Sequence, residues 1–238
     1  MTDPFGRAVA DHYHGSRDEP LVVRDGDETR EHPIEAFYFE PFDPESEAGR
    51  WLTSWVREQL LDVGAGAGRH TLVFQERVET VAVDVSDTLV EVMTDRGVED
   101  ARVGDMFSLR EAFTRDRFGS GLLVGTQAAL AGSMQGLRRL LGDLAFVTDA
   151  DATAVVDGYD PEHESAEGLL GYRGDPTPGL AHRTFHFAYE GDVGETLYFR
   201  LFSPGRLREA TVGSGWEVED VRRGDETTAY YRAALSKR

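Results

Sequence analysis

The stretch LLDVGAGAGRH, residues 60–70, constrains the fold more than any other part of the chain. A short apolar run ends here at Asp62, and three glycines then alternate with alanines. Glycine adopts left-handed backbone conformations without a steric penalty and lets another molecule approach the main chain. A helix that begins after such a turn offers unpaired N–H groups to a ligand. The stretch therefore predicts a strand–turn–helix unit with a ligand at the turn; a tight turn without a ligand is the alternative.

Short apolar segments alternate with amphipathic segments over the middle of the chain. The predicted strands are residues 59–63, 80–85, 101–103, 121–125 and 152–157, and the predicted helices are 48–58, 68–77, 87–96, 109–117 and 134–144. Strands that alternate with helices in this way predict a parallel sheet that is covered on both faces. Right-handed crossovers then give a doubly wound α/β fold.

This alternation ends after Asp157. Residues 158–180 are rich in Gly, Pro and acidic residues and predict a loop or a partly ordered insertion, whereas 183–189 and 195–202 predict an antiparallel hairpin. A helix is expected to begin at Ser203-Pro204, and the last predicted strands are 216–221 and 229–235, joined by a turn at 222–227. We therefore predict a seven-stranded, mostly parallel sheet with an antiparallel C-terminal strand and an inserted β-hairpin.

The composition limits the partners and the compartment. The chain has 44 acidic and 25 basic residues, a formal net charge of −19 and a single lysine, Lys237. An acidic surface repels nucleic acid and anionic membranes, so neither partner is expected. The same composition suits a halophile, because salt screens self-repulsion, or an acidic protein from an arginine-rich genome.

The chain contains no cysteine, which excludes disulfides and cysteine-ligated zinc. Residues 1–19 lack the apolar segment of a secretory signal, and no apolar run is long enough to span a membrane. We therefore expect a cytoplasmic protein, and we expect no bound metal.

Three acidic residues follow the first three predicted strands. Asp62 precedes the first glycine, Asp84 lies 20 positions after Gly64, and Asp105 follows the third strand. Strand ends at one edge of a parallel sheet form the ligand crevice, so these carboxylates should converge there. They suit a ligand that has a ribose, an amine and a positive centre. A dinucleotide turn has the pattern GxGxxG, and here the third glycine comes one residue early.

These motifs resemble those of the class I S-adenosylmethionine-dependent methyltransferases. Residues 62–68 (DVGAGAG) look like their motif I, DxGxGxG, 83–86 (VDVS) like their ribose-binding element, and 104–106 (GDM) like the element beside adenine. The resemblance is close over residues 51–157 and extends to the end of the chain. It implies a methyltransferase domain over 51–238, with the hairpin insertion at about 158–202, and an N-terminal segment, 1–50, that acts as a lid.

The resemblance assigns a set of residues to S-adenosylmethionine: Asp62, Gly64, Ala65, Gly66, Asp84, Val85, Asp105, Met106, Gly125 and Thr126. It implies that residues 64–66 pass under the methionine portion, with Asp62 near its amino group. It implies that residues 84–85 hold the ribose and adenine, that 105–106 contact the adenine, and that 125–126 line the methyl end.

Two family features are missing. No acidic residue occurs at the start of the fourth strand, residues 118–121 (FGSG), and no DPPY or NPPY motif for methylation of nucleic-acid bases follows it. The catalytic residues are therefore unassigned. Methyl transfer from a sulfonium needs mainly proximity and orientation, worth up to about 7–11 kcal/mol, and a general base adds to this only for some acceptors.

Aromatic residues and histidines provide the candidates for binding the acceptor: Tyr38, Phe39 and His186. An N-terminal aromatic segment often lids the donor pocket in similar methyltransferases, and core packing is the alternative. His186 lies on the predicted hairpin, which could contact the acceptor or form a homodimer surface.

Other aromatic and histidine residues fit a structural role better. Residues 12–14 (HYH) are interpreted as a solvated stretch rather than a metal site, Trp51 and Trp55 as core, and His70 as a capping or packing residue.

The sequence thus predicts transfer of a methyl group from S-adenosylmethionine to a small molecule. Two alternatives remain. One is a non-catalytic S-adenosylmethionine-binding sensor or partner subunit, and the other is a nucleotide-dependent oxidoreductase, which the early third glycine disfavours.

Overall fold

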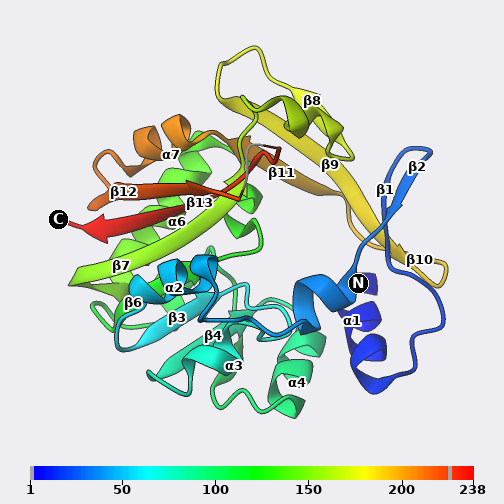
Figure 1. Ribbon diagram of the computed structural model, residues 1–238, viewed down its shortest axis with the longest axis horizontal. Helices are drawn as coiled ribbons and strands as arrows, with labels where there is room; N and C mark the ends of the chain where they lie inside the picture. Colours follow the sequence, from blue (N-terminus) through cyan, green and yellow to red (C-terminus); the bar gives the residue numbers. More distant parts are fainter. Residues whose placement is uncertain (1–2, 225–226) are drawn as a thin grey trace.

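The computed structural model describes residues 3–224 and 227–238, which form two β-sheets (Figure 1). The larger sheet has seven strands in the order β12-β13-β7-β6-β3-β4-β5. Their bounds are β3 (Leu60–Val63), β4 (Thr80–Asp84), β5 (Ala101–Val103), β6 (Phe118–Leu123), β7 (Thr148–Tyr159), β12 (Trp216–Arg223) and β13 (Tyr230–Lys237). Strands β3 to β7 pair in parallel, whereas β13 runs antiparallel to both β7 and β12. The predicted fold class is confirmed. The turn predicted at 222–227 includes residues 225–226, which lie outside the described residues.

Helices cover both faces of this sheet: α2 (Glu47–Ser54), α3 (Thr71–Phe74), α4 (Asp87–Asp95), α5 (Leu109–Ala112), α6 (Met134–Val147) and α7 (Pro204–Thr211). The predicted N-cap of α4 is confirmed, because Ser86 Oγ accepts a hydrogen bond from the N–H of Leu89. Ser203 caps α7 in the same way, with Pro204 at its first position.

Three helices are several residues shorter than predicted. Helix α2 was expected to run to residue 58 but ends at Ser54. Helix α3 was expected to begin at residue 68, but Gly68 has a φ of 76° and still belongs to the glycine turn. Helix α5 was expected to run to residue 117 but ends at Ala112, because Phe113 has an extended backbone. The Phe113 ring packs edge-on against Phe118 of β6, with ring centroids 5.1 Å apart. Packing in the core therefore ends the helix before the residue that the helical periodicity predicts.

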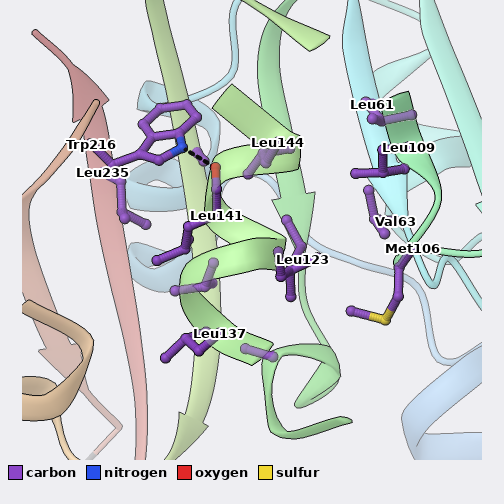
Figure 2. Packing of buried hydrophobic residues seen from close by; sticks show 14 of the residues in the cluster. Leu61, Val63, Met106, Leu109, Leu123, Leu137, Leu141, Leu144, Trp216 and Leu235 are labelled. Carbon is purple, nitrogen blue, oxygen red and sulfur yellow. Dashed lines mark hydrogen bonds between the residues drawn. The ribbon is translucent and has the colours of Figure 1, made fainter. Parts of the chain in front are cut away.

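Helix α6 packs its apolar face against one side of the sheet. Leu137, Leu141 and Leu144 are fully buried there, and the indole N–H of Trp216 donates to the carbonyl of Leu141 at 2.9 Å (Figure 2). The opposite face of the sheet packs against α2 and α3, where Leu52 and Phe74 are buried. Trp51 and Trp55 pack at the edge of this second cluster, as predicted.

The smaller sheet is antiparallel. It consists of β1 (Val22–Asp25), β2 (Glu28–Glu31), β8 (Tyr172–Gly174), β9 (Leu180–Tyr189), β10 (Asp192–Val193) and β11 (Leu197–Phe202). Strands β9 and β11 form the predicted hairpin, and β9 also pairs with β1 near the N-terminus. Of the two alternatives for 158–180, the structure shows a partly ordered insertion, since this segment contains a 3-10 helix, η3 (Glu164–Gly168), and β8.

The N-terminal residues form a helix, α1 (Pro4–His14), that the polar sequence conceals. Asp3 caps it by accepting from the N–H of Gly6 at 2.8 Å. Ala8 and Val9 are fully buried and pack in one cluster with Leu89 of α4. A stripe of small apolar residues on one side is sufficient to dock this helix, although its composition is polar overall.

The prediction that residues 12–14 are solvated is therefore wrong for His12 and Tyr13. His12 Nε2 lies 2.7 Å from a carboxylate oxygen of Glu35, and the Tyr13 hydroxyl donates to the carbonyl of Asp95 at 3.0 Å. Both side chains hold α1 in place.

The carboxyl ends of β3 to β7 point toward the smaller sheet. In Figure 1, the arrow of β13 points to the left, and the parallel strands run the opposite way, toward β9 and α1. No helix among the described residues is long and apolar enough to cross a membrane.

Candidate functional site

The glycine loop between β3 and α3 requires residues without side chains. Gly64 and Gly66 have φ angles of 68° and 60°, in the left-handed region that favours glycine. A Cβ atom on Gly64 would lie 2.3 Å from the Gln127 side chain, and one on Gly66 would lie 3.3 Å from the Tyr38 ring. The Gln127 side chain and the Tyr38 ring thus pack directly over main chain that carries no side chain of its own.

Asp84 joins the end of β4 to this loop. One carboxylate oxygen accepts from the N–H of Gly66 at 3.0 Å, and the other accepts from the N–H of Ser86 at 3.1 Å. Burial raises the pKa of Asp84, although these hydrogen bonds oppose the shift. Each oxygen has a second lone pair, so the carboxylate could also accept from a pair of ribose hydroxyls.

Asp62 lies at the end of β3, behind the glycine loop. Its side chain is buried and accepts from the Thr71 hydroxyl at 2.7 Å, at the start of α3. Burial raises the pKa of Asp62 from 3.8 to about 6, and the nearby charge of Asp84 adds to the shift. This carboxyl group therefore fixes the loop to the helix.

The Asp62→Asn variant should change how stability depends on pH. Between about pH 4 and pH 6 the folded chain keeps a proton on Asp62 that the unfolded chain has released. The free energy of unfolding therefore falls as the pH rises through this window, by about 3 kcal/mol for this group at about 1.4 kcal/mol per pKa unit. We expect the free energy of unfolding of Asp62→Asn, measured with urea, to fall less steeply with pH than that of the unchanged protein. The exposed Asp18→Asn should match the unchanged protein, and equal slopes for all three proteins would contradict this assignment.

The residues predicted to contact adenine differ in exposure. Val85 is 75% exposed and could present an apolar surface to a base. Asp105 is also exposed, and its side chain accepts from the N–H of Phe107 at 2.8 Å. Met106 is buried in the main core, so its backbone is better placed than its side chain to contact a ligand.

Asp157 anchors the loop that follows β6. Its two carboxylate oxygens accept from the N–H groups of Gly125 and Thr126 at 2.8 and 2.6 Å. The Tyr230 hydroxyl donates to it at 2.6 Å. Thr126 has a φ of 64°, a strained conformation that these hydrogen bonds hold.

Gly125 and Thr126 are among the residues that the sequence predicts for the site, whereas Asp157 is not. The signal that could have indicated it is its place: an acidic residue at the end of the fifth predicted strand, at the same edge as Asp62 and Asp84.

The structure brings one of the three predicted acceptor residues to the glycine loop. Tyr38, on the π-helix η1 (Glu35–Phe39), lies over Gly66, and its hydroxyl is 3.0 Å from Nε2 of His32. Burial and the charge of Asp84 raise the pKa of Tyr38. Its position over the loop makes Tyr38 the candidate lid residue.

The other two predicted acceptor residues, Phe39 and His186, do not lie at the glycine loop. The Phe39 ring contacts the Arg96 guanidinium at 4.8 Å and the His12 ring at 4.9 Å, on the side of α1 and α4. His186 pairs with Arg24 across β9 and β1, on the sheet face opposite Phe187.

His70 packs against Phe42, with ring centroids 4.9 Å apart. Burial lowers its pKa to about 3, and nearby arginines add to the shift, so its imidazole is neutral at physiological pH. This agrees with the predicted packing role.

Similar solved structures identify the class of protein to which this fold belongs. No protein-family model and no curated protein matches the chain. Solved structures do match it, and S-adenosylmethionine-dependent methyltransferases are among them. The seven-stranded sheet is therefore the Rossmann-like sheet of these enzymes.

Three individual structures illustrate the similarity. A methyltransferase from Bacteroides fragilis, crystallised with S-adenosyl-L-homocysteine, is 25% identical, with a TM-score of 0.79 over 99% of this chain and 94% of that chain. CcbJ methyltransferase from Streptomyces caelestis is 15% identical, with a TM-score of 0.67 over 98% of both chains. CalS10 from Micromonospora echinaspora, an aminopentose methyltransferase with bound S-adenosylmethionine, is 16% identical, with a TM-score of 0.56 over 76% of this chain and 84% of that chain.

The last two likenesses concern the fold alone, whereas the first extends over almost the whole length of both chains. The Bacteroides fragilis structure was obtained with S-adenosyl-L-homocysteine, which supports S-adenosylmethionine as the cofactor. The same likeness supports methyl transfer in general as the reaction.

Proposed function

We propose that this protein transfers a methyl group from S-adenosylmethionine to a small-molecule acceptor. The observation that carries the proposal is the contact between Asp84 and Gly66, which joins an acidic strand end to a bare glycine loop. The full-length likeness to the Bacteroides fragilis enzyme agrees with it. The acidic composition favours a small molecule over nucleic acid.

The residues present fit the proposed cofactor. Gly64 and Gly66 present main chain without a Cβ atom, and the Gln127 side chain and the Tyr38 ring lie over it, where the cofactor would bind. Asp84 would accept from the ribose hydroxyls, and the exposed Val85 would pack on the adenine. Asp62 would act on the amino group of the methionine portion from behind the loop, through hydrogen bonds or water. The segment 105–106 would lie at the far edge of the adenine.

The bound cofactor supplies a methyl group that its sulfonium already activates. The protein then has to orient the acceptor and exclude water, which account for most of such a rate enhancement. Asp157 holds Gly125 and Thr126 at the methyl end, and Tyr38 covers the glycine loop. Asp157 is thus proposed as a positioning residue, and Tyr38, within the N-terminal segment 1–50, as a lid residue.

Several broader proposals accompany this function. Phe39 and His186 stay candidate acceptor residues, and the inserted hairpin stays a candidate homodimer surface. Residues 51–238 would form the catalytic domain. We further propose a cytoplasmic, halophilic setting, which the acidic and lysine-poor composition supports.

The experiment that tests the function is transfer of a labelled methyl group from S-adenosylmethionine into small molecules of a cell extract. We expect label in a low-molecular-mass product, and we expect Asp84→Ala to weaken donor binding by about 1–3 kcal/mol, because the ribose loses its partner. Donor binding without any transfer would favour the sensor alternative, and unchanged affinity of Asp84→Ala would contradict the role of Asp84.

A further inference from the structure

Four polar residues share one face at the junction of β7 and β13. Tyr230 is directly opposite Tyr159 in the strand register, and Arg232 is directly opposite Asp157. Because side chains alternate along a strand, all four lie on the same face of the sheet. The two tyrosine rings meet edge to face, with centroids 5.7 Å apart. This group adjoins the loop that Asp157 holds, which is the proposed methyl end.

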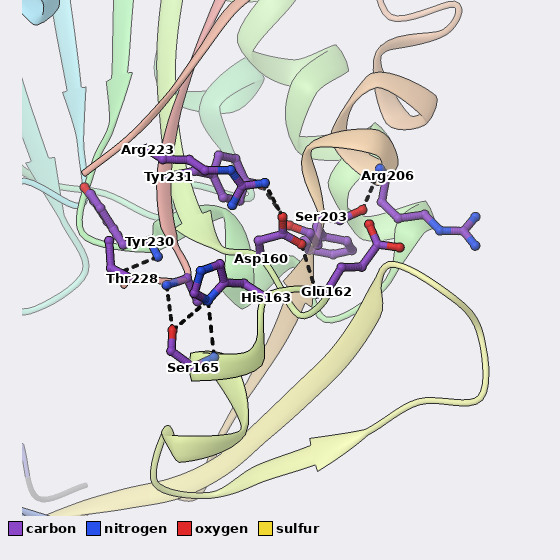
Figure 3. A network of polar contacts seen from close by, with 12 residues as sticks. Asp160, Glu162, His163, Ser165, Ser203, Arg206, Arg223, Thr228, Tyr230 and Tyr231 are labelled. Carbon is purple, nitrogen blue, oxygen red and sulfur yellow. Dashed lines mark hydrogen bonds and ion pairs between the residues drawn. The ribbon is translucent and has the colours of Figure 1, made fainter. Parts of the chain in front are cut away.

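A polar network fixes this junction in place. Asp160, just after β7, accepts from the guanidinium of Arg223 on β12, and Ser165 Oγ accepts from the N–H of Ala229 at 2.8 Å (Figure 3). The N–H of Asp160 also donates to the carbonyl of Ala229 at 2.8 Å. These contacts hold the start of β13, and none of them involves the side chains of the four residues described above.

Two arginines present unused donors at this junction. Arg232 donates through Nε to the Tyr230 hydroxyl at 3.0 Å. Arg183, on β9, donates through Nε to the carbonyl of Leu170 at 2.9 Å, and its charge acts on Tyr159. Within residues 3–224 and 227–238, neither arginine forms an ion pair, and their terminal N–H groups have no hydrogen-bond partner. Each guanidinium also lies over an aromatic ring, that of Arg183 over Phe185 at 4.7 Å and that of Arg232 over Tyr230 at 5.7 Å. These contacts orient the two side chains and leave their terminal N–H groups available to a ligand.

The local charge contrasts with that of the whole molecule. The chain has a net charge of −19, yet a third arginine, Arg69, lies close enough to Arg232 for their charges to interact. The charge of Asp157 acts on Arg232, and that of Glu40 acts on Arg69. Among the described residues, the three guanidinium groups, of Arg69, Arg183 and Arg232, are therefore balanced by only these two carboxylates. The neighbouring imidazole of His32 is neutral at physiological pH, because burial and then Arg183 lower its pKa to about 4. The arginines therefore form a half-buried, positively charged surface beside the rings of Tyr159 and Tyr230.

We propose that the methyl acceptor carries a carboxylate or phosphate group, which Arg183 and Arg232 bind beside Tyr159 and Tyr230. Forked guanidinium groups bind such anions through paired hydrogen bonds, and the tyrosines provide flat apolar walls for the rest of the molecule. This inference rests on the proposed function and names the substrate class of the same site.

The test uses the protein saturated with S-adenosylhomocysteine, with the binding of that compound measured first. Titrations then compare benzoate and phenyl phosphate with neutral benzyl alcohol and cationic benzylammonium. We expect one or both anions to bind and the neutral and cationic compounds to bind at least about tenfold more weakly. Benzoate and phenyl phosphate together distinguish a carboxylate from a phosphate acceptor.

Variants complete the test. Arg183→Gln and Arg232→Gln should each weaken anion binding about tenfold or more, while leaving the affinity for S-adenosylhomocysteine unchanged. Arg183→Lys keeps the charge but not the fork and should show an intermediate loss. The exposed Arg208→Gln on α7 should bind the anion as the unchanged protein does. Equal binding of anions and benzyl alcohol, no anion binding, or full anion binding by both glutamine variants would overturn the inference. No binding of S-adenosylhomocysteine would instead overturn the proposed function.

Discussion

Asp157→Ala should lower the free energy of unfolding by about 3 kcal/mol or more. The substitution leaves the N–H groups of Gly125 and Thr126 and the Tyr230 hydroxyl without their common acceptor. These hydrogen bonds are part-buried, and donors that lose their partners cost about 1–3 kcal/mol each; loss of an unfavourable buried charge offsets part of the sum. Urea unfolding, followed by far-ultraviolet circular dichroism, measures the change.

Two companion variants make this result interpretable. Asp157→Asn keeps one carbonyl acceptor and should lose less stability than Asp157→Ala. Asp151→Ala, an exposed position on the same strand, should change the free energy of unfolding by less than about 0.5 kcal/mol. If Asp157→Ala were as stable as Asp151→Ala, Asp157 would not hold the loop at the proposed methyl end.

Gly66→Val should reduce the affinity for S-adenosylhomocysteine by about 100-fold or more. Valine is strained at the φ of 60° that Gly66 adopts. Its branched side chain would occupy the space under the proposed cofactor, where even a Cβ atom comes within 3.3 Å of Tyr38. Isothermal titration of the folded variant measures the loss.

Gly168→Val is the matched control for this substitution. A Cβ atom on Gly168 meets no heavy atom within 4 Å, and its φ is not in the left-handed region. Its affinity for S-adenosylhomocysteine should therefore be unchanged. Binding by Gly66→Val equal to that of the control would show that the glycine loop does not carry the cofactor.

Local sequence patterns were sufficient to predict the main sheet. The apolar runs at residues 60–63 and 80–84 are buried throughout and could only be central strands. The cap residues Ser86 and Ser203 marked helix starts correctly, because capping depends on neighbours three positions away. The order of glycines and acidic residues likewise placed Asp62 and Asp84 at the same edge of the sheet, but the hydrogen bond from Gly66 to Asp84 was not predicted.

Long-range contacts explain what the sequence did not reveal. Pairing of Val23 with Phe187 joins the N-terminal hairpin to the insertion across more than half of the chain, and no local pattern encodes it. Helix α1 was missed because only a narrow stripe around Ala8 and Val9 is apolar. Asp157 was assigned only as a strand residue, since its hydrogen bonds to Gly125 and Tyr230 depend on the closed sheet.

The most direct test of the central claim is isothermal titration of the protein with S-adenosylhomocysteine and, separately, with NADH. The contact of Asp84 with the glycine loop and the early third glycine predict binding of S-adenosylhomocysteine and no response to NADH. Tight binding of NADH with no response to S-adenosylhomocysteine would contradict the claim and support the oxidoreductase alternative.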